Sequence, residues 1–324
     1  MSIDLIPHIT EYEKEYFRKL EKKEMKYLFI GLGSIGMRHL KNLRSLTDEP
    51  IYALRTKIDT ELDKQYNITS MTSVKEAMAL KPDVVFITNP TSKHMSYALM
   101  FCDCHLFIEK PISTNSVDVA HLLAIMEANN KVCFVGYNYR FHPNVKSYHS
   151  DIGKVLYAQI QFGKWLPDWH PDEDYTKSYS ARKEMGGGAV LALSHAIDYA
   201  CWLFGDIKSV YAQTSKVSSL DIDVEDIASI ILETRSRAII EIHLDYLHSS
   251  FIHSIKVVYD NGTLENDLTD LKIRDETFVD EMAHFLNCVK GIEKPIISHK
   301  DIISVMRIID AIRESSRTGR KVYL

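Results

Sequence analysis

The first half of the chain alternates between short apolar runs and longer segments in which apolar residues recur at helical spacing. Leu40, Leu43 and Leu46 define one predicted helix, residues 116–129 a second, and a capping box at 73–76 the start of a third. The apolar runs predict buried strands at residues 27–30, 51–54, 83–88, 105–108 and 132–135. Buried strands that alternate with helices are typical of a parallel sheet covered on both faces.

The pattern changes in the second half. Residues 155–162 and 239–247 alternate in part between apolar and polar positions, as strands with one buried face do. Asp260-Asn-Gly262, between two short apolar runs, is a strong hairpin signal. Two helices are predicted at 278–289 and 300–316, each closed by a glycine. This half therefore predicts an α+β domain with an open, mostly antiparallel sheet.

The sequence thus predicts an α/β chain in three parts. Residues 1–25 form a charged extension in which acidic and basic residues alternate, expected to be a solvated helix outside the fold. Residues 26–143 are expected to form a doubly wound parallel sheet of the Rossmann type. Residues 144–324 are expected to form the α+β domain.

The charge balance excludes a surface built for nucleic acid. The chain has 39 Lys and Arg against 44 Asp and Glu, a formal charge of −5, whereas nucleic-acid binding needs a basic excess. No apolar run approaches the roughly 20 residues that span a bilayer, and no cationic leader precedes an apolar stretch. We therefore expect neither a nucleic-acid nor a membrane partner.

The five cysteines do not predict a disulfide framework, because their number is odd and the chain is long. Cys102 and Cys104 are the closest pair, but their spacing is wrong for a zinc knuckle and they precede an apolar run. We expect buried, reduced thiols, no bound metal and a cytoplasmic location.

A glycine motif follows the first predicted strand and opens the first predicted helix. It reads Gly31-Leu-Gly33-Ser34-Ile35-Gly36. The first glycine permits a tight turn, the second lets a pyrophosphate approach the backbone, and the third lets helix and strand pack closely. The N–H groups at the helix start are free to bind phosphate oxygens. These five positions are expected to bind a dinucleotide; the alternative is a glycine-rich turn in an unrelated α/β protein.

The end of the second strand bears on the choice between NAD and NADP. NAD-selective sites commonly place Asp or Glu there, on the ribose 2′-hydroxyl. Here the segment reads Leu54-Arg55-Thr56-Lys57, and two cations with a hydroxyl suit a 2′-phosphate better. Arg38, just after the glycines, offers a further donor. We expect NADP or NAD with NADP favoured; alternatively, Arg55 and Lys57 are exposed loop charges.

Five motifs in a fixed order resemble those of one known family. They are Gly31–Gly36, Thr88-Asn89-Pro90 with His94, Glu109-Lys110-Pro111, Gly136–Pro143 and Gly186–Asp198. From about residue 26 to its end, the chain resembles the glucose–fructose oxidoreductase/inositol dehydrogenase (Gfo/Idh/MocA) family. The resemblance implies a nicotinamide cofactor on the Rossmann domain and a second domain that binds substrate and makes oligomer contacts. It also implies hydride transfer at a carbinol carbon of a carbohydrate, in a homodimer or homotetramer.

The resemblance assigns a catalytic pair. Lys110 would hold the substrate oxygen and stabilise its developing negative charge. His195 would be the general base that takes the hydroxyl proton, a role that suits an imidazole near neutral pH. The other positions placed at the cofactor are Asn89, Pro90, His94 and Glu109, together with Lys110.

One departure concerns the acid that many members carry three or four residues before the histidine. Ala192 and Leu191 stand at those positions. Asp198, one helical turn after His195, could partner it or form a salt bridge elsewhere. His195 itself could instead be a structurally buried helix residue. The residues expected to contact substrate in these motifs are Lys110, Asn138, Arg140, His195 and Asp198.

The segment between the last two motifs is long, aromatic and polar, without clear periodicity. Such loops in compact domains often carry function. Trp165, Trp169 and Tyr175 offer flat faces for sugar rings, and Lys164 and Arg182 could hold a carboxylate or phosphate. Equally, this is a packed surface loop whose tryptophans fill gaps between domains.

The leading functional hypothesis is a dehydrogenase or reductase of a sugar, sugar acid or nucleotide-linked sugar. An NAD-dependent glycosidase, in which oxidation is transient, is an alternative that a non-dissociating cofactor would favour. A non-catalytic NAD(P)-binding sensor or scaffold is a third, kept open by the missing acid. The presence of both Lys110 and His195 weighs against the third.

Overall fold

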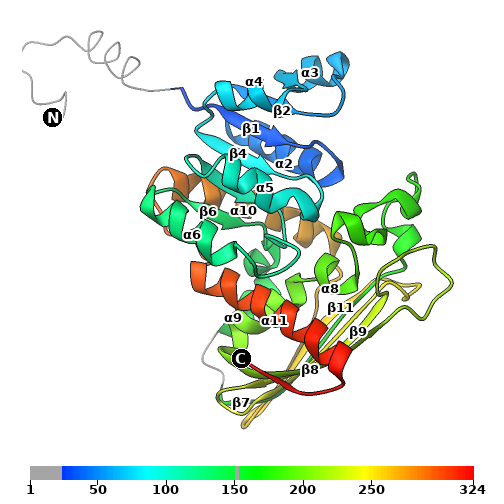
Figure 1. The fold of residues 1–324 in the computed structure, drawn as a ribbon. Coiled ribbons are helices and arrows are strands. Elements are labelled where there is room, and N and C mark those ends of the chain that lie inside the picture. Colours follow the sequence, from blue (N-terminus) through cyan, green and yellow to red (C-terminus); the bar gives the residue numbers. More distant parts are fainter. Residues whose placement is uncertain (1–23, 150–152) are drawn as a thin grey trace, which may run out of the picture.

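The computed structural model describes residues 24–149 and 153–324. The charged segment expected outside the fold lies, up to residue 23, outside the described residues. The described chain forms two stacked domains, one around a six-stranded sheet and one around a seven-stranded sheet (Figure 1). The predicted class, a Rossmann domain followed by an α+β domain, is confirmed.

The first sheet is wholly parallel, with strand order β3-β2-β1-β4-β5-β6. The order reverses between β1 and β4, and in such sheets ligands bind at the carboxyl ends of the strands beside this point. The strands are β1 (Tyr27–Ile30), β2 (Ile51–Leu54), β3 (Ile68–Met71), β4 (Val84–Ile87), β5 (His105–Ile108) and β6 (Cys133–Val135). Five of them were predicted and β3 was missed.

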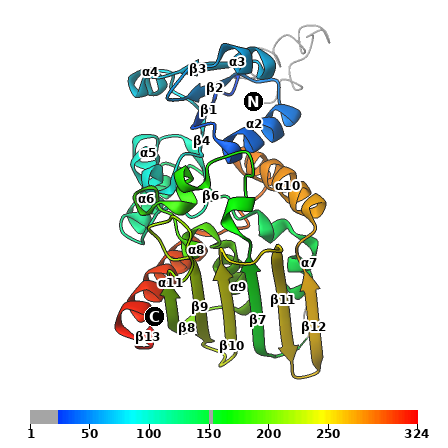
Figure 2. The ribbon, with the colours of Figure 1, turned by 90° about the vertical axis from the view of Figure 1, so that its right-hand side faces the viewer.

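Helices cover both faces of this sheet, with α5 and α6 on one side and α2 on the other (Figure 2). The helices of the domain are α2 (Ser34–Leu46), α3 (Thr60–Tyr66), α4 (Val74–Ala79), α5 (His94–Met100) and α6 (Val119–Ala128). Two 3₁₀ turns, η2 (Thr91–Lys93) and η3 (Asn138–Phe141), follow β4 and β6. The predicted cap at Ser73 forms, because its hydroxyl accepts from Glu76 N.

The second sheet has the order β12-β11-β7-β10-β9-β8-β13. Only β7 and β10 pair in parallel, so the expectation of a mostly antiparallel sheet is confirmed. The predicted hairpin joins β11 to β12. The strands are β7 (Val155–Gly163), β8 (Ile207–Ser215), β9 (Ile227–Thr234), β10 (Ile239–Asp245), β11 (Ile252–Tyr259), β12 (Gly262–Asp267) and β13 (Val322–Tyr323).

Helices cover one face of this sheet. The α-helices of the second half are α7 (Pro143–Lys146), α8 (Ala189–Ala192), α9 (His195–Phe204), α10 (Leu271–Val289) and α11 (His299–Thr318). Short 3₁₀ turns fill the connections: η4 (Ser147–His149), η5 (Leu166–Asp168), η6 (Tyr175–Lys177), η7 (Tyr179–Ala181) and η8 (Lys183–Met185). Helix α11 packs on β8, and α9 packs on β7 and β10.

The opposite face of the seven-stranded sheet is not covered by a helix of the described chain (Figure 2). Along β9 and β10 the side chains alternate between buried and accessible, as a one-sided sheet requires. Tyr211, Ile231 and Ile239 are exposed on the strands of this face. The association of copies expected from the sequence stays a prediction.

Helix α10 leaves the second half of the chain and packs on the first domain, beside α2 (Figure 2). Its Phe285 meets three strand aromatics edge-on or tilted, with ring centroids 5.3–5.7 Å from Phe86, Phe107 and Phe134. Such buried aromatic contacts dominate core energetics. The last third of the chain therefore helps to close the Rossmann domain.

A fully buried arginine holds the two domains in register. Arg140, in η3 at the end of the first domain, is inaccessible to solvent. Its Nη2 donates to Asp198 Oδ1 on α9 at 2.7 Å, its Nε to Asp198 Oδ2 at 2.9 Å, and its Nη1 to Asp301 Oδ2 on α11 at 3.1 Å. A third acceptor is Ile296 O. One guanidinium thus joins the Rossmann domain to two helices of the second domain.

No single helix of residues 24–149 and 153–324 is long and apolar enough to cross a membrane. One pair of helical segments, residues 183–192 and 195–204, is together long and apolar enough to span a membrane, but it is bent by 45°. Its residues from 189 to 200 are buried in the protein. All five cysteines are free, as expected, but Cys102 and Cys201 are only half-buried.

Replacing Arg140 should strongly destabilise the protein. The Arg140→Met variant leaves the Asp198 carboxylate buried without its partner, so we expect a loss of about 3–5 kcal/mol in the free energy of unfolding. Urea denaturation followed by circular dichroism measures it. Lys208→Met, which breaks the accessible pair with Glu233, should cost less than about 1 kcal/mol. Equal losses in the two variants would contradict the role of Arg140.

Candidate active site

The glycine turn between β1 and α2 leaves an open space where a pyrophosphate fits. Gly31 has φ +90°, and a Cβ there would lie 3.2 Å from Asn89. A Cβ at Gly36 would lie 2.7 Å from Gly31 O and 2.8 Å from Thr88 Oγ1, so only glycine allows this close packing. At Gly33 a Cβ would meet nothing within 4 Å. The two outer glycines are thus needed for the fold, whereas Gly33 keeps the approach to the backbone clear.

The start of helix α2 is suited to an anion. Gly33 is its N-cap residue, no side chain caps it, and its first turn contains no acidic residue. The N–H groups of Ser34, Ile35 and Gly36 have no acceptor within the helix, because a first turn lacks a preceding one. Free N–H groups and the positive end of the helix dipole bind phosphate. This motif therefore fits a dinucleotide pyrophosphate.

The end of β2 carries a guanidinium that is incompletely satisfied. The Arg55 side chain is 16% exposed, its Nη1 lies 3.8 Å from Asp63 Oδ1, and this nitrogen has no hydrogen-bond partner in the described chain. Thr56 and Lys57 are exposed beside it. Arg38 is different, because its Nη1 pairs with Asp275 of α10 at 2.5 Å. Arg55 is thus only loosely paired with Asp63 and lacks a hydrogen bond at Nη1, whereas Arg38 is bound closely by another helix.

His94 holds two cofactor-side loops together. Its Nε2 lies 2.8 Å from Asn89 O and its Nδ1 2.9 Å from Pro111 O. The ring is buried, and burial lowers its pKa below the ordinary value, so a neutral ring donates one of these bonds. Contact of His94 with the cofactor stays a prediction; in this structure both of its ring nitrogens face backbone carbonyls. Asn89 itself is half-buried, and its Oδ1 lacks a partner among the described residues.

Glu109 is also internal rather than a cofactor contact. Its Oε1 accepts from His39 Nε2 of α2 at 2.6 Å, and its Oε2 accepts from Lys110 N at 3.1 Å. Burial raises the pKa of this carboxyl, but the bond with His39 and the charges of His39 and Lys110 outweigh it, so the pKa lies below its usual value. The Glu109 carboxylate thus ties α2 to the backbone of Lys110.

Lys110 reaches from the first domain to the second. It follows β5, and its Nζ donates a 2.6 Å hydrogen bond to Ala192 O in α8. Ala192 is one of the two positions at which the acid was expected and is missing. An ammonium group has three donors, so two remain for a ligand. The carbonyl of Ala192 anchors the lysine where a carboxylate was expected.

His195 begins α9 close to this anchored lysine. The ring is 7% exposed and lies edge-on to Tyr137 and Tyr139, with centroids 5.7 and 5.1 Å away. Its Nδ1 is buried with no hydrogen-bond partner in the described chain. Burial, then the charge of Lys110 and further cations, holds the pKa of His195 well below its usual value. A neutral imidazole is thus available at neutral pH to accept a proton.

The structure resolves the alternatives for Asp198. Its carboxylate binds Arg140 and does not partner His195. Both side chains are buried and paired with one another, and their expected contact with substrate stays a prediction. Asn138 is likewise inaccessible, and its Nδ2 donates to Thr277 Oγ1 of α10 at 2.6 Å. These three polar residues set the position of α9 and α10.

The aromatic loop after β7 is held by its own contacts. Trp169 Nε1 donates to Lys164 O at 3.1 Å, and its ring packs edge-on against Tyr246. Tyr175 Oη accepts from Asp221 N at 3.2 Å. Trp169 and Tyr175 are half-buried. One part of each side chain packs against the protein, and the other part stays accessible.

Two further loop residues keep an accessible portion. Arg182 Nε donates to Thr176 O at 2.5 Å, and its Nη1 lies 3.5 Å from Asp221 Oδ1. Trp165 is half-buried, and its backbone N–H donates to His248 O at 2.6 Å. Contact of these residues with a substrate stays a prediction.

Sequence reasoning missed two buried groups beside this site. His39 lies on α2, seventy positions before its partner Glu109, and a lone histidine on a helix gave no signal. Glu281, on α10, is inaccessible to solvent, and both its oxygens lack a hydrogen-bond partner among the described residues. Burial raises the pKa of Glu281 well above its usual value, and the charges of Glu109 and Asp198 add to this. Glu281 therefore holds its proton to higher pH in the folded protein than a glutamate in water does.

Comparison with known proteins gives matches over both domains. Residues 25–137 match the model of an oxidoreductase family with an NAD-binding Rossmann fold, and residues 149–265 match the GFO/IDH/MocA C-terminal domain. A D-xylose 1-dehydrogenase (NADP(+)) 2 of Haloferax volcanii is 25% identical, over 75% of this chain and 80% of its own. A myo-inositol 2-dehydrogenase of Thermotoga maritima is 25% identical, over 91% and 97%.

Solved structures share the fold. GenD2 from gentamicin A biosynthesis, in complex with NAD, superposes with a TM-score of 0.83 at 21% identity, covering 93% of this chain and 97% of its own. The WlbA dehydrogenase from Bordetella pertussis, in complex with NADH and UDP-GlcNAcA, gives 0.81 at 18% identity, covering 94% and 98%. The two-domain arrangement is therefore common to these proteins.

The buried Glu281 should leave a signature in the dependence of stability on pH. A glutamate in the unfolded chain ionises near pH 4.3, whereas Glu281 in the folded protein stays protonated to higher pH. The unfolded state therefore binds fewer protons, and stability falls as pH rises from there towards the folded pKa. For Glu281→Gln the unfolding free energy should therefore fall less steeply with rising pH than that of wild type above about pH 4.3, by at most about 1.4 kcal/mol per pH unit.

Denaturant unfolding at several pH values, with wild type and variant compared at each, gives both slopes. The control variant is Glu76→Gln, which changes an exposed glutamate of α4 and should show the wild-type slope. Parallel slopes for wild type and Glu281→Gln would show that Glu281 ionises normally in the folded protein.

Proposed function

Because the chain belongs to the Gfo/Idh/MocA family of oxidoreductases, we propose that it transfers hydride between NADP and a hydroxyl-bearing carbon of a sugar, sugar acid or nucleotide-linked sugar. The observation that carries this proposal is that a lysine of the first domain reaches the segment of the second domain that carries His195, whose pKa its charge lowers. Lys110 Nζ binds Ala192 O, three residues before His195. An ammonium donor and a neutral imidazole are the groups that oxidation of an alcohol requires.

The residues at the end of the first sheet fit the cofactor. Gly33 and the N–H groups at the start of α2 would hold the pyrophosphate, and Arg55 would face the ribose end. Asn89, with an unpaired buried oxygen, and Lys110 lie further along the strand ends. When bound, the nicotinamide supplies the acceptor for hydride. These residues bind and orient it, and the protein groups around the substrate handle the proton.

His195 is the proposed general base. Because its pKa is lowered, the ring is unprotonated at neutral pH and can take the proton of the substrate hydroxyl. Lys110 directs its two remaining donors at the same oxygen and stabilises the negative charge that develops as the proton leaves. Position 192 is an alanine, so no carboxylate there shares this work. Its backbone carbonyl accepts the hydrogen bond from Lys110.

The carbohydrate class of the substrate is supported by the relatives. The names of the two relatives specify D-xylose and myo-inositol, and the WlbA structure contains UDP-GlcNAcA. These ligands share adjacent hydroxyl groups on a ring. In this chain the half-buried Trp165, Trp169 and Tyr175 are the proposed faces for such a ring, and Arg182 the proposed donor for an acidic substituent.

Removing the imidazole should abolish most turnover without disturbing the cofactor. With the best substrate from a sugar panel, His195→Gln should lower kcat by ~10²–10⁴-fold, the usual scale for lost acid–base catalysis. NADPH binding, followed by fluorescence titration, should stay within about threefold of wild type, because Gly33 and α2 are unchanged. His121→Gln, at an exposed position on α6, is the matched control.

The pH profile separates catalysis from a structural role of this histidine. Because the pKa of His195 lies below its usual value, kcat/KM of wild type for oxidation should hold down to below about pH 6.5 and then fall. That acid limb should be absent in His195→Gln. Wild-type turnover in the variant at every pH would refute the assignment of the base.

The proposed preference for NADP depends on Arg55. Arg55→Gln removes a charge without cutting the side chain short, so NADPH affinity should fall by about tenfold or more, as expected for a lost charged hydrogen bond. NADH affinity should change little. Arg317→Gln, at an exposed arginine of α11, is the control. A wild-type preference for NADH, or an equal loss for both cofactors, would contradict the proposal; fluorescence titration measures each.

A further inference from the structure

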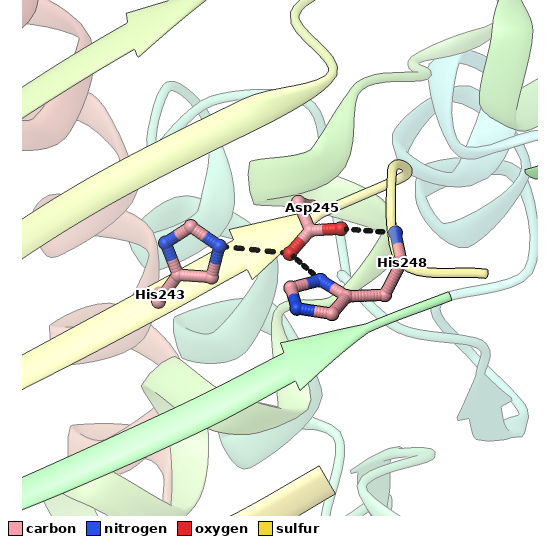
Figure 3. Close-up of side chains that lie close together, drawn as sticks. All are labelled: His243, Asp245 and His248. Atoms are coloured by element: carbon pink, nitrogen blue, oxygen red, sulfur yellow. Dashed lines mark hydrogen bonds and ion pairs between the residues drawn. The ribbon is translucent and has the colours of Figure 1, made fainter. Parts of the chain in front are cut away.

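Two histidines and an aspartate converge at the end of β10 (Figure 3). His243 Nε2 lies 2.8 Å from Asp245 Oδ2, and His248 Nδ1 lies 2.6 Å from the same oxygen. One ligand atom from each residue lies within 4.8 Å of the other two. The three side chains therefore already surround a common point.

The carboxylate at the centre is held in place before any ligand binds. Asp245 is buried, and its Oδ1 accepts from Leu247 N at 2.7 Å and from His248 N at 3.0 Å. These backbone bonds fix the plane of the carboxylate and leave Oδ2 to the two imidazoles. Its ion pairs within the described chain are with His243 and His248. The partners of this buried carboxylate are thus two imidazoles and no Lys or Arg side chain of the described chain.

The neighbouring strand leaves space for the carboxylate. Gly163, at the end of β7, pairs with Asp245 in the sheet. A Cβ at Gly163 would lie 2.6 Å from Asp245 Oδ2, so any larger residue would push the carboxylate aside. This glycine sits in a strand, where glycine weakens pairing and commonly marks a close approach. The close approach here is that of a potential metal ligand.

The cluster is open on one side. The side chains of His243 and His248 are 32% and 43% exposed, whereas that of Asp245 is 1% exposed. His243 points to the face of the sheet that no helix of the described chain covers, since its strand neighbours Ile242 and Leu244 point to the core. An ion can therefore enter from solvent, and coordination positions remain for water.

From these features we propose that His243, Asp245 and His248 bind one divalent transition-metal ion of the zinc type. Two imidazoles and one carboxylate are ligands that Zn²⁺ takes in sites with an open fourth position. This site is not the catalytic one, and the proposal does not depend on the proposed function. The ion would bind Nε2 of His243, Nδ1 of His248 and Oδ2 of Asp245.

Binding needs only a small adjustment. For bonds of 2.0–2.2 Å in a tetrahedral site, neighbouring ligand atoms lie roughly 3.3 Å apart. The present separations of 2.6 and 2.8 Å therefore widen by about half an ångström. Each imidazole would bind the ion through the nitrogen that now faces Asp245 Oδ2, Nε2 in His243 and Nδ1 in His248. The ion would thus replace the two contacts of these nitrogens with Oδ2.

The position of the site suggests what the ion does. The backbone around it fastens the start of the aromatic loop: Lys164 N donates to Asp245 O, Leu166 N to Tyr246 O and Trp165 N to His248 O. An ion that joins β10 to His248 would make this attachment more rigid. The proposed ion is therefore a structural clamp on the loop.

Metal titration of the full chain tests the proposal. Tag-free protein is stripped with chelator, and Co²⁺ and Zn²⁺ are added at pH 7.5 without cofactor or substrate. We expect one equivalent of Zn²⁺ by isothermal titration calorimetry and visible Co²⁺ absorption bands that Zn²⁺ displaces. His243→Gln and His248→Gln should each weaken binding by tenfold or more, because each removes one of the three proposed ligands.

The control variant is His170→Gln, an exposed histidine of the aromatic loop outside the cluster, which should bind like wild type. Circular dichroism verifies that each variant is folded, as expected for changes at partly exposed side chains. Zn²⁺ should also raise the Tm of wild type and not that of His248→Gln. Folded wild type that takes up no Zn²⁺ would overturn the proposal, as would undiminished binding in both cluster variants.

Discussion

The arrangement of the two domains depends on one buried guanidinium. Arg140 ends the Rossmann domain, and its bonds to Asp198 and Asp301 fix the helices α9 and α11 of the second domain against it. Its charge is inaccessible to water, so the two carboxylates must stay in place or the arginine remains uncompensated. Because Asp198 lies one turn after His195, the same ion pair sets the position of the proposed base. Domain packing and site geometry are therefore one constraint.

A second line of buried polar contacts runs through the site from the other direction. His39 on α2 binds Glu109, Glu109 binds the backbone of Lys110, and Lys110 binds Ala192 O in the second domain. The helix whose start fits the pyrophosphate is thereby connected to the proposed catalytic lysine. Burial of these groups also excludes water from His195, which keeps the imidazole neutral. The chemistry proposed here follows from the packing that surrounds it.

The features that the sequence predicted well are local ones. The glycines at 31 and 36 are required by close contacts within the turn and with the neighbouring strand end, whereas the glycine at 33 leaves the approach to the backbone open. The five predicted strands of the first domain are short and largely apolar, so each is visible in the sequence as an apolar run. By contrast, β3 reads Ile-Thr-Ser-Met, and its polar residues hid it. Strands β8 and β9 were missed because neither alternates strictly between apolar and polar residues: β8 carries several polar residues, and β9 places three apolar residues, 230–232, in succession.

Pairings between distant positions could not be predicted. Arg140 and Asp198 stand in motifs beside the site, and a polar residue there looks the same whether it faces a ligand or another side chain. The packing of α10 on the first domain likewise depends on a chain reversal that no local pattern encodes. Glu281 gave no sign of its burial, because a glutamate on a helix is usually solvated. These are properties of the assembled core.

The most direct test of the account is transfer of deuterium from a carbohydrate to the cofactor. Wild-type protein is incubated with NADP and uniformly deuterated pentoses, hexoses, uronic acids and cyclitols, so that the position oxidised need not be known. Mass spectrometry of the recovered cofactor should show NADPH heavier by one deuterium with at least one sugar. Protein that binds NADP and these sugars but never yields labelled cofactor, bound or released, would contradict hydride transfer as its function.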